Sequence, residues 1–197
     1  SGKSTLIKLL LGELDADAGN CKRGTNLEVA YFDQHRHGLD LEQSVIDAVG
    51  DGKRDLMVNG HPRHVISYLQ DYLFEPERVN APVKSLSGGE KNRLMLAKLM
   101  LKPSNLLVLD EPTNDLDVET LRALEEAILA FPGCIMVISH DRWFLNRIAT
   151  HMLAFEGNSE VVWFEGNYDA YIEDKKSRLG DKYDAITKIK YKRISVD

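Results

Sequence analysis

Two short apolar runs constrain the fold of this chain more than any other feature. Leu106–Leu109 lies between Pro103 and Asp110, and Cys134–Ile138 is a second run that is rich in β-branched residues. Runs that are short and apolar throughout are typical of strands buried on both faces of a parallel sheet. Residues 118–130, between the two runs, have helical spacing. Strands that alternate with helices in this way predict an α/β domain with a mainly parallel sheet.

The rest of the chain extends this pattern and interrupts it once. Further strands are expected at 27–32, near 151–155 and near 161–165, and further helices at 6–11, 142–149 and 168–179. Residues from about 41 to 102 look helical instead, with helices at 44–49, 63–74 and 88–102. Because this block interrupts the alternation, we interpret it as a helical subdomain inserted into the sheet domain.

The chain begins inside a motif whose chemistry is anion binding. Gly2, Lys3 and Ser4 match the end of G-x-x-x-x-G-K-[ST], whose first Gly and next three residues would lie upstream. Gly2 lets the backbone close around an anion, and the helix start after it offers free N–H groups. Lys3 would neutralise the β- and γ-phosphates of a nucleotide, and Ser4 would supply a hydroxyl to Mg²⁺. Half a motif at a chain end is also what chance or a tag would produce.

Two carboxylates follow the first apolar run directly. The carboxyl ends of buried parallel strands form the edge of the sheet at which α/β proteins bind ligands. Asp110 is therefore placed to hold the Mg²⁺ shell, and Glu111 to polarise a water for attack on the γ-phosphate. A solvated acidic turn is the alternative interpretation, and the phosphate motif upstream argues against it.

A second helix start carries paired glycines. In Leu86–Glu90, Ser87 has the character of an N-cap, and Gly88 and Gly89 allow the backbone to approach a ligand closely. A plain helix cap would have the same sequence. The position of this pentapeptide about twenty residues before the acidic strand end favours the anion site.

Together these residues resemble the ABC ATPase superfamily. Leu86–Glu90 is similar to its signature motif, and the other motifs appear in the family's order: Gln34 after a strand, the D-loop-like Asn114–Asp117, and His140 within Ser139–Asp141. The resemblance implies a P-loop NTPase (RecA-like) α/β core over residues 1–165, truncated inside the phosphate loop, with the helical subdomain at about 41–102. Residues 166–197 would form a C-terminal helix and a basic tail.

The resemblance also implies the site. In this superfamily two cassettes face each other, and each ATP lies between the phosphate loop of one cassette and the signature of the other. Glu111 and His140 would be catalytic, with His140 at the γ-phosphate. The implied ATP-binding residues are Ser1, Gly2, Lys3, Ser4, Thr5, Gln34, Ser87, Gly88, Gly89 and Asp115, and the implied Mg²⁺ shell is Ser4, Gln34 and Asp110.

Three segments narrow the resemblance to the ABC-F family. They are Asp110–Asp117, Ser139–Leu145 and Phe164–Tyr171. The helical subdomain is most similar to the Uup branch of that family, and the last residues to its translational-throttle branch. ABC-F membership implies a cytoplasmic ATPase whose second cassette lies upstream in the same chain, and which acts on the ribosome rather than in transport.

The charge distribution fits a nucleic-acid partner. Residues 175–197 contain eight Lys or Arg and three Asp, out of 25 Lys/Arg and 31 Asp/Glu in the chain, so the remainder has a net charge of −11. Such an arm, with Tyr183 and Tyr191 within it, suits ribosomal RNA. The alternatives are a solvated tail and a tail that packs on its own acidic body.

Two other functions share the cassette chemistry. The ATPase subunit of a membrane transporter would carry the same motifs, but the D-loop-like segment, the residues around His140 and the basic tail argue against it. No apolar run in the sequence approaches the roughly 20 residues that cross a bilayer. A degenerate cassette would bind nucleotide without hydrolysing it. The presence of Glu111 and His140 argues against this second alternative.

Overall fold

β4 (Leu106–Asp110) is the middle strand of a three-stranded parallel sheet, between β1 (Val29–Asp33) and β5 (Cys134–Ile138). Leu107, Val108 and Leu109 are fully buried. The prediction of parallel strands is therefore confirmed, and the prediction of burial is confirmed for β4. It was wrong for most of β5, an edge strand of the described sheet, in which Cys134 is exposed and only Ile138 is buried.

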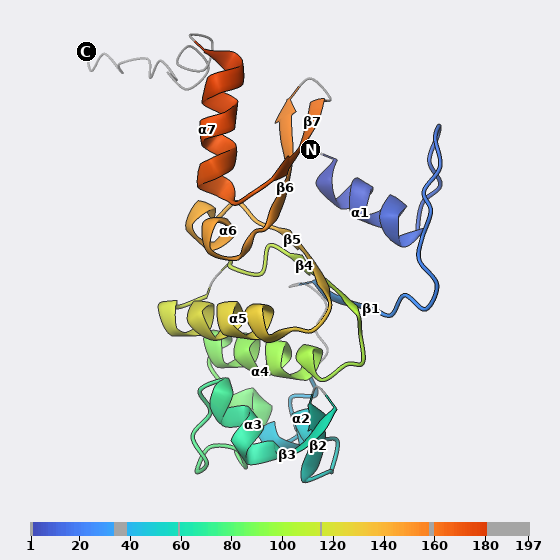
Figure 1. The fold of residues 1–197 in the computed structure, drawn as a ribbon. Coiled ribbons are helices and arrows are strands. Elements are labelled where there is room, and N and C mark those ends of the chain that lie inside the picture. Colours follow the sequence, from blue (N-terminus) through green and yellow to red (C-terminus); the bar gives the residue numbers. More distant parts are fainter. Residues whose placement is uncertain (1, 34–38, 59, 115, 158–159, 181–197) are drawn as a thin grey trace, which may run out of the picture. The chain divides into compact units, whose positions relative to one another are not determined.

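The computed structural model describes residues 2–33, 39–58, 60–114, 116–157 and 160–180. Ser1, Gln34, Asp115 and residues 181–197 of the basic tail lie outside the described residues. The chain divides into two compact units, Ser1–Asp141 and Arg142–Asp197. Figure 1 shows the helices and strands of both units in chain order.

α1 (Lys3–Leu11) begins within the phosphate motif and buries one side chain, that of Ile7. Ile7 on this helix packs with Val108 of β4 and Ile138 of β5. Gly12 ends the helix in a left-handed conformation, with φ of 76°, and its N–H bonds back to the last turn. The helix expected at 6–11 is confirmed, and it begins three residues earlier, so that Lys3 opens its first turn.

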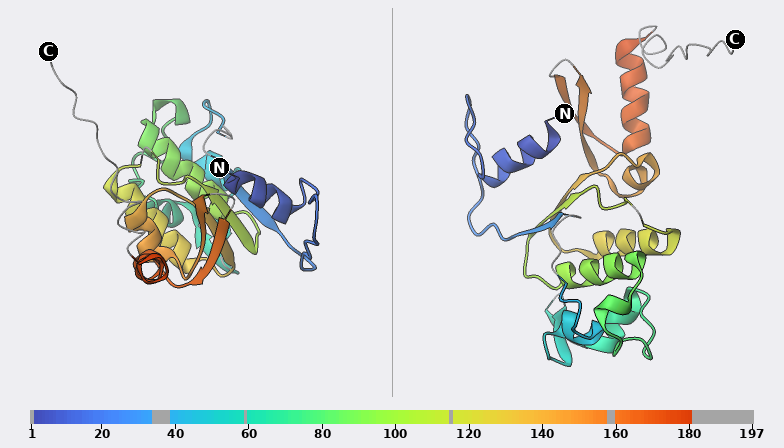
Figure 2. Two further views of the ribbon diagram at one scale, coloured as in Figure 1. Left: turned by 90° about the horizontal axis from the view of Figure 1, so that it is seen from above. Right: turned by 180° about the vertical axis from the view of Figure 1, so that it is seen from behind.

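The inserted block contains α2 (Val45–Gly50), α3 (Val65–Asp71), the 3₁₀ turn η1 (Val83–Ser85) and α4 (Gly88–Met100). α4 also lies beside α5 (Val118–Ala130), which follows the central strand β4 (Figure 2). α4 also contacts β1 directly, and this contact attaches the helical block to the sheet. The start of α4 lies near the loop that precedes α5, since Gly89 is close to the Asp117 carboxylate.

The expectation that the block is helical throughout was wrong at its centre. β2 (Asp55–Val58) and β3 (His61–His64) form an antiparallel hairpin, so α3 begins at Val65 and ends at Asp71 rather than spanning 63–74. The sequence contains a signal for this turn, because Asn-Gly at 59–60 is a strong hairpin dipeptide.

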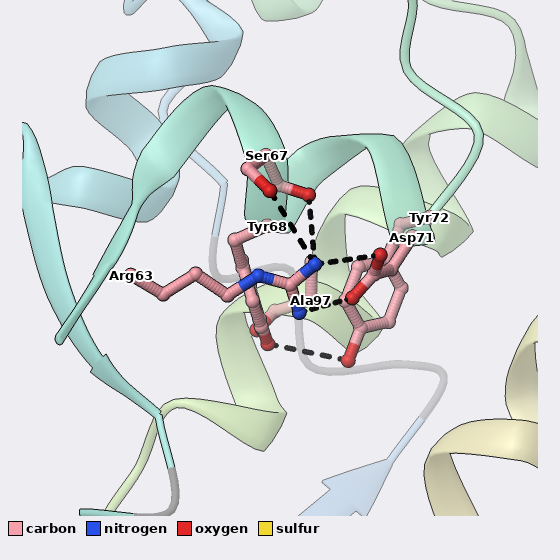
Figure 3. Close-up of polar contacts among 6 residues, drawn as sticks. All are labelled: Arg63, Ser67, Tyr68, Asp71, Tyr72 and Ala97. Carbon is pink, nitrogen blue, oxygen red and sulfur yellow. Dashed lines mark hydrogen bonds and ion pairs between the residues drawn. The ribbon is translucent and has the colours of Figure 1, made fainter. Parts of the chain in front are cut away.

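A cluster of polar side chains joins this hairpin to α3 and α4 (Figure 3). Both guanidinium amino groups of Arg63, on β3, pair with the carboxylate of Asp71, at the end of α3. The Tyr68 hydroxyl donates to the carbonyl oxygen of Ala97 on α4 at 2.8 Å, and the Tyr72 hydroxyl lies 3.2 Å from the Tyr68 oxygen. Burial raises the pKa of Tyr68 well above its ordinary value, so the phenol stays a neutral donor. The cluster holds α4 in a defined position.

The second unit contains α6 (Arg142–Ile148), the antiparallel pair β6 (His151–Gly157) and β7 (Glu160–Glu165), and α7 (Tyr168–Leu179). These elements confirm the helices and strands expected there. α7 is joined to β6 through Glu156, whose carboxylate accepts from the Tyr171 hydroxyl at 2.7 Å and from Arg178 at 2.8 Å.

Glu156 is expected to contribute stability that depends on pH. Its side chain is only 6% exposed, and the hydrogen bond from Arg178 holds the pKa of its carboxyl below the ordinary 4.5. The contribution is therefore present above about pH 4.5 and is lost as the pH falls through the lowered pKa of the folded state. Glu156→Gln should lower the free energy of unfolding of this unit by about 1–3 kcal/mol at pH 7.

Urea unfolding followed by tryptophan fluorescence measures this effect, because both tryptophans of the chain, Trp143 and Trp163, belong to the second unit. Glu160→Gln, an exposed change on β7, is the matched control. The difference between Glu156→Gln and wild type should narrow below pH 4.5. A difference that is independent of pH would contradict this account of Glu156.

Candidate nucleotide site

Three residues from distant motifs meet at the carboxyl edge of the parallel sheet. The Lys3 ammonium lies 3.1 Å from Nε2 of His140, although the two residues are 137 positions apart. Nε2 of His140 also lies 3.4 Å from a carboxylate oxygen of Glu111. A cation, an imidazole and a carboxylate therefore share one small region, where the first turn of α1 approaches the ends of β4 and β5.

The backbone at the end of β4 aims Glu111 toward this region. Glu111 has a φ of 48°, in the left-handed region that non-glycine residues rarely adopt. Its N–H donates to the carbonyl oxygen of Ile138 at 2.8 Å, and its carboxylate accepts from the backbone N–H of His140 at 3.3 Å. Strained conformations of this kind concentrate at functional sites. The two strand ends thus orient the carboxylate and the imidazole toward each other.

Hydroxyl groups hold the surrounding loops. The Tyr31 hydroxyl on β1 donates to Asp110 at 3.3 Å, which orients that carboxylate. The hydroxyls of Thr113 and Ser139 lie 3.3 Å apart, and the Ser139 hydroxyl also accepts from the N–H of Asp141 at 3.0 Å. The sequence prediction did not include Tyr31 or Thr113, because their positions depend on the strand order.

The start of α1 is suited to an anion. Gly2 precedes the helix with a φ of 99°, and Ser4 and Thr5 are exposed in its first turn. A helix start offers free N–H groups and the positive end of the helix dipole. These residues lie next to Lys3, and so at the same edge of the sheet as Glu111 and His140.

The signature residues form a second group at the start of α4. Ser87 caps the helix by accepting from the N–H of Glu90 at 3.2 Å, and Glu90 accepts from the N–H of Ser87 at 2.8 Å. This reciprocal capping lowers the pKa of Glu90, and Arg78, 3.3 Å away, adds to the shift. Ser87 and Gly88 are exposed, and Gly89 is half-buried. The predicted N-cap is confirmed, and its exposed face is available to a partner.

Three predicted site residues, Ser1, Gln34 and Asp115, lie outside the described residues. Their roles remain predictions.

Among the described residues, no helix is both long enough and apolar enough to pass through a membrane.

A parallel sheet with a lysine at the start of the first helix and an Asp-Glu pair at the end of its central strand defines a P-loop ATPase domain. Residues 1–114 match the family described as ABC transporter, and the chain belongs to this family. The chain is 52% identical over 187 residues to the ATP-binding protein Uup of Escherichia coli K12, a match that covers 95% of this chain and 29% of Uup.

A second relative is the energy-dependent translational throttle protein EttA of Haemophilus influenzae. It is 47% identical over 195 residues, which cover 99% of this chain and 35% of EttA. Uup and EttA are both ABC-F proteins, so the expected family is confirmed. The chain spans about a third of the length of these relatives.

Solved structures share the fold. A structure titled RNase-L Inhibitor superimposes with a TM-score of 0.62 at 24% identity, over 91% of this chain and 35% of that one. The complex of the archaeal ribosomal stalk protein aP1 with the archaeal ribosome recycling factor aABCE1 gives a TM-score of 0.58 at 25% identity, over 88% of this chain and 34% of that one. The predicted P-loop NTPase fold is therefore confirmed.

Domains of this family bind ATP and Mg²⁺. The described residues fit both groups. Lys3 and the start of α1 present positive charge and N–H groups to phosphates, while the Ser4 hydroxyl and the Asp110 carboxylate are the hard oxygen ligands that Mg²⁺ prefers.

Proposed function

We propose that this chain is the ATP-hydrolysing cassette of an ABC-F protein that acts on the ribosome in the cytoplasm. The observation that carries the proposal is the convergence of Lys3, Glu111 and His140 at one edge of the sheet. A degenerate cassette that only held nucleotide would have no need for a carboxylate oriented by a strained backbone.

Each of the three side chains has a role in attack of water on the γ-phosphate of ATP. Glu111 would accept the proton of the attacking water as general base. Lys3 and His140 would stabilise the negative charge that spreads over the phosphoryl oxygens. Mg²⁺, held by Ser4, Asp110 and the predicted Gln34, would supply further charge neutralisation. The products are ADP and phosphate.

The exposed signature supports a second cassette as partner. Ser87, Gly88 and Gly89, together with the predicted Asp115, would complete the ATP site of an opposing cassette rather than their own. The relatives are about three times as long as this chain, which leaves room for another cassette in the same polypeptide.

Two observations support the ribosome as the partner: the names of similar proteins and the basic tail. One relative is a translational throttle protein, and one structural neighbour is a ribosome recycling factor bound to a stalk protein. Within the tail, Lys175 and Arg178 face Glu156, and Arg178 also pairs with Asp174. Contact with RNA is therefore proposed for the basic residues after Gly180.

Ribosome binding is tested with full-length protein held in the ATP state by Glu111→Gln. This protein should co-sediment with ribosomes. Replacing Lys188, Lys190, Lys192 and Arg193 with Ala should weaken the binding and reduce its salt dependence, because each lost phosphate contact lowers the slope of log K against log salt by about 0.7–0.9.

The matched control removes four exposed basic residues elsewhere, at Lys22, Lys53, Arg54 and Lys102. An unchanged salt series for the tail variant would show that the tail is not the RNA contact. Trapped protein that fractionates with membranes and ignores ribosomes would instead support the transporter alternative.

A further inference from the structure

Arg93 is a largely buried cation that connects α4 to the start of α5. Its side chain is 12% exposed, and it lies one turn beyond Gly89 of the signature. The Nη1 amino group of Arg93 donates to the hydroxyl of Thr120 at 3.1 Å. The same nitrogen lies 3.6 Å from a carboxylate oxygen of Asp117. The guanidinium also lies over the ring of Phe74, 5.9 Å from its centre.

Asp117 brings the signature and the D-loop-like segment together. It ends the segment that begins at Asn114, and it caps α5 by accepting from the N–H of Thr120 at 2.7 Å. That backbone hydrogen bond is the largest cause of its lowered pKa. A Cβ placed on Gly89 would come within 3.1 Å of the Asp117 carboxylate, so the two loops are already in close contact. The carboxylate is therefore held between Gly89, Arg93 and the first turn of α5.

Stability alone does not explain a guanidinium at this position. The Thr120 hydroxyl belongs to a residue that is only 1% exposed, and Nε of Arg93 is buried with no hydrogen-bond partner among the described residues. Replacing a buried charge cluster with well-packed apolar side chains is often neutral or stabilising. What an apolar residue could not do is hold Asp117 and Thr120 at a defined distance from the signature helix.

We propose that Arg93 is a positioning residue that fixes the end of the D-loop-like segment to the signature helix, so that both present one rigid surface to the opposing cassette. The proposal rests on the proposed function, because it concerns how two cassettes close on ATP. Arg93 touches neither the phosphate motif nor Glu111 among the contacts of the described residues, and so it acts through the loops it orders.

The test uses full-length protein with Arg93→Met, which keeps the length and the contact with Phe74 but removes the donors. Arg122→Met, an exposed arginine on α5, is the matched control. Because small misplacements can cost about 10²-fold in rate, Arg93→Met should lower kcat by about 10–100-fold with KM for ATP changed less than threefold. ATP binding at the phosphate motif should persist, and cassette closure in the Glu111→Gln background should be lost. Arg93→Lys should restore part of kcat.

Thr120→Val provides a milder variant that keeps the shape of the side chain. It should reduce kcat by a smaller factor, and the double variant with Arg93→Met should be no worse than Arg93→Met alone, because both remove the same contact. A lowered melting temperature with wild-type kcat in both variants would assign Arg93 a purely structural role and overturn the proposal. Failure of the wild-type protein itself to hydrolyse ATP would instead refute the proposed function.

Discussion

Glu111→Gln in the full-length protein should lower kcat for ATP hydrolysis by about 10²–10⁴-fold, the usual cost of removing a general base. The amide keeps the size of the carboxylate and can still accept from the N–H of His140, so ATP binding and the fold should be retained. With hydrolysis blocked, the two cassettes should stay closed on ATP. Single-turnover phosphate release and equilibrium nucleotide binding measure the two effects separately.

Glu126→Gln, which removes an exposed carboxylate from α5, is the control for loss of charge. It should behave as wild type in both measurements. Phosphate release at the wild-type rate from Glu111→Gln would refute the assignment of Glu111, and loss of ATP binding would mean that this side chain acts in binding rather than in proton transfer.

His140→Ala should reduce kcat by about 10²–10³-fold, the typical effect of removing one donor that stabilises transition-state charge. The side chain of His140 is 80% exposed, so the truncation leaves no cavity and should hardly change the melting temperature. His61→Ala, an exposed histidine on β3, is the matched control. Activity close to wild type in His140→Ala would remove His140 from the catalytic set.

The two changes should also be non-additive. Glu111 and His140 approach within 3.4 Å. When two residues act as one catalytic unit, removing either of them already removes most of their joint contribution to kcat. The double variant should therefore be much less impaired than the product of the single effects. A loss of kcat in the double variant equal to the product of the two single losses would show that the two residues act independently.

Features that depend on neighbouring residues were predicted well from the sequence. The boundaries of α5, β5 and α7 agree with the expected ranges, because helical and strand periodicity are local signals. Ser87 was expected to cap a helix, and it does so through Glu90, three residues away. The hairpin of β2 and β3 was missed, although its turn dipeptide at 59–60 is just as local.

The sequence by itself determined the family, the order of the motifs and the residue types that would handle phosphate, because each motif is a contiguous set of side chains with its own chemistry. Only the tertiary structure decided that Lys3 reaches His140, that Tyr31 orients Asp110, and that Arg93 joins the signature helix to α5. Those contacts follow from the strand order β1-β4-β5 and from the packing of α4 on α5. Pairings between distant segments are set by the packing of the whole core, which no short stretch of the sequence encodes.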